Sequence, residues 1–310
     1  MTEAAPPDLR QQAQRAGSLS MTGSPATRVL GVVALAAAAV MAILALWISP
    51  ADAVQGDAVR LMYVHVPSIW VAYGGFALTA FASSRVLRWT RSGASMFGWM
   101  AGLLGWTRAA TAGAHSDIAP RQVRHWDRVA GAAAELGVLF TALTLVTGSL
   151  WGKVTWGTYW QWDARLTTTV LLFVTYLGYL ALRRLPAESR VRARRSAVMA
   201  LIAVVNLPIV HYSVDWWRTL HQEASLNLEP GGDRNITGEM YWTLLFSWAV
   251  FTVVALWIGI HRYRVLRLEE LADEALLEEL LEARRAEDES TGRRSAEQRS
   301  SRPGEQATNR

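Results

Sequence analysis

The sequence predicts an all-α integral membrane protein with six transmembrane helices, and three observations lead to this fold class. Hydrophobic residues make up 51% of the 310 residues and charged residues only 18%, below the quarter that is typical of soluble domains. Six stretches carry no charged side chain: 29–50, 61–84, 138–150, 166–182, 197–210 and 240–260. Arginines gather in every second segment between these stretches, as they do on the cytoplasmic side of membrane proteins.

The six stretches differ in how directly their length predicts a span, because a membrane helix needs roughly 20 mostly apolar residues. The first, second and last stretches are long enough by themselves, and the other three reach this length once their small and polar flanks are counted. Residues 1–27 are polar and rich in Ala, Pro, Gln and Ser. We expect a flexible cytoplasmic segment there rather than a signal peptide, because the apolar run that follows is too long for a signal-peptide core.

The positions of the cationic residues orient the predicted helices. The segments after the second, fourth and sixth spans are rich in arginine: Arg85, Arg88, Arg91, Arg108, Arg121, Arg124, Arg128, Arg183, Arg184, Arg190, Arg192, Arg194, Arg195, Arg262, Arg264 and Arg267. The opposite segments contain few cations: Arg60, Lys153, Arg165, Arg218 and Arg234. The positive-inside rule therefore predicts two cytoplasmic termini and an outer location for the segment between the third and fourth helices.

The cytoplasmic side is expected to carry elements beyond a membrane domain that covers residues 28–262. A cytoplasmic insertion occupies about 85–128, and its apolar part, 92–107, is too short for a span and predicts an interfacial or cytoplasmic helix. Residues 263–288 place apolar side chains at helical spacing, with both charge signs on the polar face, which predicts an amphipathic helix. The composition of 289–310 predicts a disordered tail.

Composition also limits the chemistry that this chain can perform. The sequence contains no Cys, which excludes disulfides, thiolate metal sites and covalent haem attachment through a CxxCH motif. It contains no GxxxxGK[ST] motif, so nucleotide hydrolysis is not expected of this chain. The net charge of +5 follows from the cytoplasmic arginines, and we therefore expect membrane lipid, and not nucleic acid, as the partner of these charges.

Three of the six histidines fall on the predicted outer side. His65 lies near the outer end of the second helix, His211 at the outer end of the fifth, and His221 in the following loop. A single histidine at the lipid–water boundary is often only a polar tip that reaches for headgroups. Histidines at membrane depth are uncommon, however, so three on one side form a candidate functional site.

The same outer side carries an unusual concentration of aromatic residues. The segment "WGKVTWGTYWQWDARLTT", residues 151–168, contains Trp151, Trp156, Trp160 and Trp162, and the next outer loop adds Trp216 and Trp217. An interfacial anchoring belt places Trp at helix ends. A loop punctuated by Gly152 and Gly157 fits that pattern poorly and favours an aromatic platform for a flat, apolar ligand.

A flat ligand that contains a metal would account for both the histidines and the aromatic residues. Two neutral imidazoles, one from the second helix and one from the outer end of the fifth helix or its loop, could bind haem iron from opposite faces. Lys153, Arg165 and Arg218 are candidates for binding the haem propionates. Asp163 is a candidate for holding Arg165 or an indole N–H in place. The spacing of the residues does not choose between His211 and His221 as the second ligand.

At these residues the chain resembles a known family. The segment 151–168 is similar to the WWD signature of haem-handling proteins in cytochrome c maturation, WGxxxWGTxWxWDxRLT. The stretches "MYVHVPSIW" and "VNLPIVHYSVDWWRTLHQ" resemble the two histidine-bearing stretches of its CcmC branch. The resemblance runs from about residue 29 to 260. It implies non-covalent binding of haem b on the outer face of the bacterial inner membrane and transfer to the haem chaperone CcmE, beside CcmD and the ABC transporter subunits CcmA and CcmB.

Carried over to this chain, the resemblance implies that His65 and His221 are the axial ligands of the haem iron and that His211 is a nearby polar residue. It implies a haem-contacting set in and beside the WWD segment: Trp151, Trp156, Tyr159, Trp160, Trp162, Asp163, Arg165 and Arg218. Tyr159 stands where a Trp is usual, which keeps an aromatic ring and adds a hydroxyl.

The expected function is haem binding and transfer without catalysis by this chain, apart from possible assistance in attaching haem to the chaperone. The alternative is an enzyme, a WWD-type cytochrome c haem lyase similar to CcmF or CcsA, but those proteins carry more spans and a second histidine pair. A transmembrane haem channel would need polar residues across the bilayer. Asn206 is the main polar residue within a span, and a helix–helix hydrogen bond accounts for it. A membrane scaffold without haem would leave the clustered His and Trp unexplained.

Overall fold

The computed structural model describes residues 23–90, 121–222 and 236–300, with side chains described up to 294. The regular structure in these ranges is helical, without any strand. One isolated β-bridge joins Asp52 and Gly56. The chain divides into two units, Met21–Tyr263 and a second unit of Met1–Ser20 with Arg264–Arg310, and each is described by itself. The predicted helix at 92–107 lies outside the described residues, as do most of the insertion and the N-terminal segment.

Six helices in the described ranges are long and apolar enough to cross a membrane, which confirms the predicted fold class. The first span combines α2 (Pro25–Ile43) with a π-helical turn, η1 (Leu44–Ile48), and the second combines the short helix η2 (Asp57–Leu61) with α3 (Met62–Thr90). The third and fourth are α5 (Arg121–Trp156) and α6 (Ala164–Arg184). The fifth is formed by α7 (Ser189–Ala203) and α8 (Asn206–Trp216), and the sixth lies in α9 (Gly238–Ser300).

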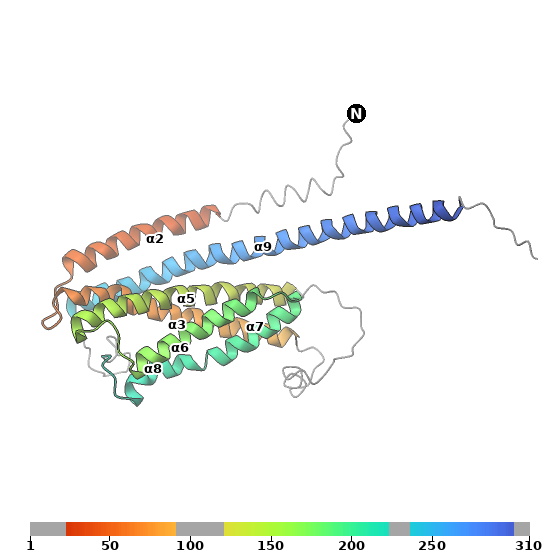
Figure 1. The fold of residues 1–310 in the computed structure, drawn as a ribbon. Coiled ribbons are helices and arrows are strands. Elements are labelled where there is room, and N and C mark those ends of the chain that lie inside the picture. The colour runs from red at the N-terminus through yellow and green to blue at the C-terminus, as the bar shows by residue number, and fades with distance from the viewer. Residues whose placement is uncertain (1–22, 91–120, 223–235, 301–310) are drawn as a thin grey trace, which may run out of the picture. The chain divides into compact units, whose positions relative to one another are not determined.

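The helices α3, α5, α6, α7 and α8 pack against one another around a shared core (Figure 1). Small residues bring α3 and α5 close together, since a Cβ on Gly75 would lie 2.8 Å from the carbonyl oxygen of Ala133. Phe76 of α3 stacks on Tyr176 of α6 with ring centroids 3.8 Å apart. Van der Waals packing of this kind drives helix association where lipid replaces water.

The fifth span is broken between α7 and α8, and Pro208 explains the break. Proline lacks a backbone N–H, and its ring collides with the carbonyl four residues earlier, here that of Val204. Residues 204 and 205 accordingly form a turn between the two helices. Directly after it, Asn206 Nδ2 donates a 2.9 Å hydrogen bond to the carbonyl of Thr168 in α6, which confirms the helix–helix contact predicted for this residue.

Two ion pairs join the helices near their arginine-rich ends. Arg183 of α6 donates to both carboxylate oxygens of the buried Asp127 in α5, at 2.6 and 2.9 Å. Arg262 of α9 makes a two-point ion pair with Glu135 of α5. Moving the helices apart would leave each charge without its partner, and the two ion pairs therefore help to hold the helices together.

In the second unit, α9 continues through Ser300, past residue 288 where we expected disorder to begin. Alternating Arg and Glu side chains in 282–300 favour a helix over a disordered tail, because opposite charges three or four residues apart attract. Part of its apolar face is open, and the Leu280 side chain is 59% exposed.

Candidate functional site

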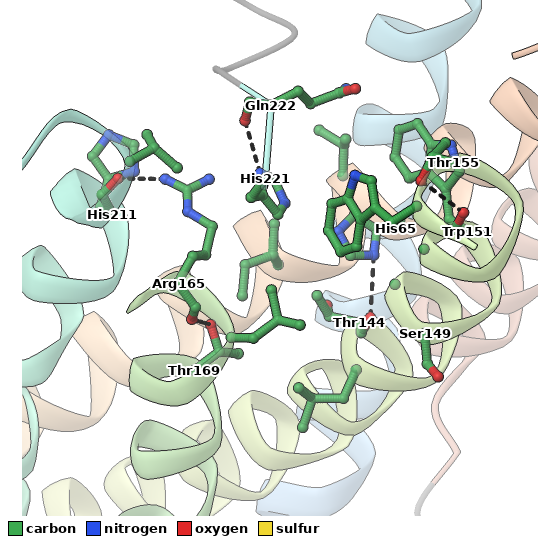
Figure 2. Close-up of a pocket in the computed structure, with 18 of the residues that line it drawn as sticks. His65, Thr144, Ser149, Trp151, Thr155, Arg165, Thr169, His211, His221 and Gln222 are labelled. Atoms are coloured by element: carbon green, nitrogen blue, oxygen red, sulfur yellow. Dashed lines mark hydrogen bonds between the residues drawn. The ribbon is translucent and has the colours of Figure 1, made fainter. Parts of the chain in front are cut away.

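A cavity of about 200 Å³ lies among α3, α5, α6 and α8, at the ends that carry the tryptophan-rich segment. The non-helical segment 217–222, which follows α8, closes one side of the cavity and carries His221 into it. Figure 2 shows His65 and His221 beside each other, with Arg165 and His211 on the far side of His221.

His65 is held in one orientation by α5. Its Nδ1 donates to the carbonyl oxygen of Thr144 at 3.1 Å and to Oγ1 of Thr147 at 3.2 Å. Gly148 leaves room for the ring, because a Cβ at that position would lie only 2.8 Å from Cε1 of His65. The edge of the Trp151 ring also contacts the imidazole, with centroids 5.7 Å apart.

His221 is held by neighbours in its own segment. Its backbone N–H donates to Thr219 Oγ1 at 2.9 Å, and its Nδ1 donates to the carbonyl oxygen of Gln222 at 2.7 Å. Burial, together with the positive charge of Arg165, lowers the pKa of His221 to about 4. The imidazole is therefore neutral at physiological pH, which is the form that binds a metal.

The two imidazoles have the separation expected of a ligand pair. Their ring centroids lie 6.4 Å apart and their planes are inclined by 32°. Two metal–nitrogen bonds of about 2 Å, each followed by about 1 Å to the ring centre, span about 6 Å. Each Nδ1 faces a carbonyl oxygen and therefore carries the proton, which leaves the lone pair of each Nε2 free.

Aromatic rings surround this pair. The Trp156 ring lies 6.3 Å from that of His221, and Trp160 and Trp70 also line the cavity. Trp151 and Trp156 belong to the last turns of α5, so the loop that we predicted over the whole segment begins only at Gly157, whose φ is +75°. Residues 153–156 contain neither glycine nor proline, and α5 therefore continues through Trp156.

Two of the four charged residues predicted for the site, Arg165 and Asp163, have different surroundings. Arg165 lines the cavity and donates to the carbonyl oxygen of His211 at 2.5 Å and to Ser213 Oγ at 3.3 Å. Asp163 caps α6 through Leu166 N at 2.8 Å and also accepts a hydrogen bond from the Thr219 hydroxyl. The carboxylate thus contacts the segment of His221, and not the guanidinium or an indole N–H as we had expected.

Other predicted residues lie away from the cavity. Trp162 is 75% exposed, and its ring contacts that of Trp160 edge to face. Lys153 donates to the carbonyl oxygen of Gly157 at 3.0 Å and lies over the ring of the exposed Tyr159. Arg218 is also absent from the cavity lining. None of the four residues Lys153, Tyr159, Trp162 and Arg218 lines the cavity, and we call them the rim residues below.

The structure adds cavity residues that the sequence had not indicated. Trp70 and Tyr73 follow His65 on α3 and lie on the cavity side of that helix, together with Ile69. Ile69 and Tyr73, four and eight residues after His65, follow the helical repeat, and this signal was available in the sequence, whereas the spacing of five for Trp70 does not follow it. His211, which the resemblance makes a nearby polar residue, lines the same cavity.

The described residues contain no cluster of three or more His, Cys, Asp or Glu side chains that could hold a bare metal ion. Two neighbouring imidazoles among tryptophans suit instead a metal that carries its own equatorial ligands. Haem is such a group, and histidine is a common axial ligand of its iron. The fold and the site together define a multi-pass membrane protein whose aromatic cavity, with two adjacent imidazoles, suits haem.

Comparison with known proteins gives the family. The model of the family CcmC, heme exporter protein C, matches residues 10–114 and 97–276. A heme exporter protein C of Haemophilus influenzae is 35% identical over 223 residues, which cover 72% of this chain and 76% of that protein. One from Escherichia coli K12 is 34% identical over 68% of this chain and 74% of its own length. One from Bradyrhizobium diazoefficiens is 39% identical, over 58% of this chain and 56% of that protein.

The chain belongs to the heme exporter protein C family. The names of its relatives support a role in haem handling for cytochrome c maturation, among other Ccm components, rather than that of a conventional enzyme.

Proposed function

We propose that this protein binds haem b non-covalently between His65 and His221 and delivers it to the haem chaperone CcmE. The observation that carries the proposal is the pair of neighbouring imidazoles, with ring centroids 6.4 Å apart and each Nδ1 held by a carbonyl oxygen. Haem bound there supplies iron with two free axial positions. The residues of this chain orient both imidazoles and enclose them in aromatic walls.

The remaining site residues have distinct proposed tasks. Trp151, Trp156 and Trp160 contact the porphyrin, while Arg165 neutralises a propionate at the cavity wall. Asp163 acts through Thr219 on the segment of His221.

Four residues at the rim are proposed to bind the chaperone or an exposed propionate. They are Lys153, Tyr159, Trp162 and Arg218. Tyr159 and Trp162 offer exposed aromatic surface, which suits a docking site.

We propose that the protein resides in the bacterial inner membrane with this site facing the periplasm, beside CcmD and the transporter subunits CcmA and CcmB. The distribution of arginine supports this orientation. Energy for release is expected from ATP hydrolysis by the transporter subunits. The WWD-type haem lyase is less well supported, since the described residues provide six membrane helices and three cavity histidines, which are too few for a second ligand pair.

The proposal is tested by the optical spectrum of the purified protein beside three variants, His65→Ala, His221→Ala and His211→Ala. A low-spin haem b spectrum in the wild type, lost or converted to high spin in the first two variants and retained in the third, is the expected result. His211→Ala is the matched control, because His211 lines the same cavity. A wild-type protein that takes up no haem on reconstitution would refute the proposal.

A further inference from the structure

Gln55 connects two parts of the site that are far apart in the sequence. Its Oε1 accepts a 2.7 Å hydrogen bond from Nε1 of Trp151, and its Nε2 donates a 3.4 Å hydrogen bond to Oε1 of Gln222. Trp151 contacts the ring of His65, and the backbone carbonyl of Gln222 accepts a hydrogen bond from His221 Nδ1. The Gln55 side chain therefore links the surroundings of one histidine to those of the other.

A tight turn fixes the place from which this side chain extends. Asp52 and Gly56 pair through two backbone hydrogen bonds of 3.0 and 3.1 Å, and Gly56 has a φ of +58°, which favours glycine. The Asp52 carboxylate also accepts hydrogen bonds from the backbone N–H of Gln55 at 2.7 Å and of Val54 at 2.9 Å. Backbone motion at Gln55 is therefore restricted, and an anchored amide can position its partner.

The segment of His221 needs such support because it has no helix of its own. Residues 217–222 are non-helical. Among the described residues, two side chains of this segment, Thr219 and Gln222, form hydrogen bonds with other elements. Thr219 donates to Asp163 on one side, and Gln222 accepts from Gln55 on the other. His221 lies between these two attachments.

We infer that Gln55 is a positioning residue for His221, acting through Gln222. This inference rests on the proposed function, since it assigns Gln55 to the geometry of the second axial ligand. Loss of the Gln55 amide leaves the two hydrogen bonds between His65 and α5 in place, whereas it removes one of the two attachments of the His221 segment. The expected consequence is a haem whose bond to His221 opens more often.

The test compares Gln55→Leu with Gln55→Glu, using Gln161→Leu as the matched control at an exposed glutamine of the neighbouring loop. Leu removes both hydrogen bonds. Glu still accepts from Trp151, and rotation of the Gln222 amide allows Gln222 to donate to the new carboxylate. In ferrous haem-loaded protein, we expect CO to bind about fivefold faster in Gln55→Leu, because one lost hydrogen bond raises the open fraction of His221 by about this factor. The Glu and control variants should resemble the wild type.

Hydrogen–deuterium exchange on the haem-free protein provides a second readout. Peptides that contain residues 219–222 should exchange faster in Gln55→Leu, whereas peptides of α3 should not change. If Gln55→Leu fails to accumulate in membranes, Gln222→Leu removes the same hydrogen bond from the other end. Wild-type exchange in 219–222 and wild-type CO rates in the Leu variants would overturn the inference and leave the proposed haem site intact. Absence of haem in the wild type, with faster exchange in Gln55→Leu, would overturn the proposed function instead.

Discussion

Replacement of Gly148 by Ala tests whether the orientation of His65 controls haem binding. The new Cβ would lie 2.8 Å from Cε1 of the imidazole, whereas carbon atoms in contact are about 3.5–4 Å apart. The ring must therefore retreat by about 0.7 Å. Gly148, Thr144 and Thr147 all belong to α5, so a ring that moves away from Gly148 also moves away from the two oxygens that accept its proton.

The size of the effect follows from these hydrogen bonds. They measure 3.1 and 3.2 Å, and an increase of about 0.7 Å takes both beyond about 3.6 Å, where a contact is no longer a hydrogen bond. Loss of about 1 kcal/mol for such contacts corresponds to roughly a fivefold higher dissociation constant for haem. Titration of the haem-free protein with haem, followed by its optical spectrum, measures this constant.

Gly178→Ala is the matched control, because Gly178 is also helical and a Cβ there would meet nothing within 4 Å. Alanine in a helix is favoured over glycine by about 0.5–1 kcal/mol, so this variant should retain both stability and haem binding. If Gly148→Ala binds haem as tightly as Gly178→Ala, with the same low-spin spectrum, the idea that α5 fixes the His65 imidazole is wrong.

Three further predictions follow from the fold and the site. Replacing both Trp156 and Trp160 by Ala should lower haem occupancy and transfer to the chaperone while membrane insertion stays normal; unchanged transfer would argue against the aromatic platform. Asp127→Ala removes the carboxylate that pairs with the half-buried Arg183 and should lower stability by about 3 kcal/mol, measured as a lower melting temperature in detergent with an unchanged haem spectrum. Asn206→Leu should cost about 1 kcal/mol, because it removes one hydrogen bond between two membrane helices, and an unaltered melting temperature would contradict this.

The sequence predicted the fold class because membrane helices depend mainly on local composition. Each charge-free stretch corresponds to one of the six spans. The predicted ends of the helices were less accurate where a polar segment still forms a helix. The polar aromatic residues after Leu150 suggested a loop, yet they are compatible with a helix, and α5 continues through Trp156. The break in the fifth span had a local signal in Pro208.

The site could be predicted only in part, because its geometry depends on contacts between distant segments. Residue spacing did not decide between His211 and His221, whereas in the folded chain the ring of His221 lies 6.4 Å from that of His65. Gln55 gave no local signal at all, since its two hydrogen-bond partners are distant in the sequence. The ligand assignment itself stays a prediction until the spectra of the histidine variants are measured.

The two histidines are supported by elements of unequal stiffness. His65 belongs to a long helix that packs tightly on α5, whereas His221 belongs to a short non-helical segment. If haem binds between them, the iron bond to His221 should break first and the bond to His65 last. The protein would then release its cargo in a fixed order and present the same side of the porphyrin to every acceptor. Handover would be directional even though the two ligands are chemically identical.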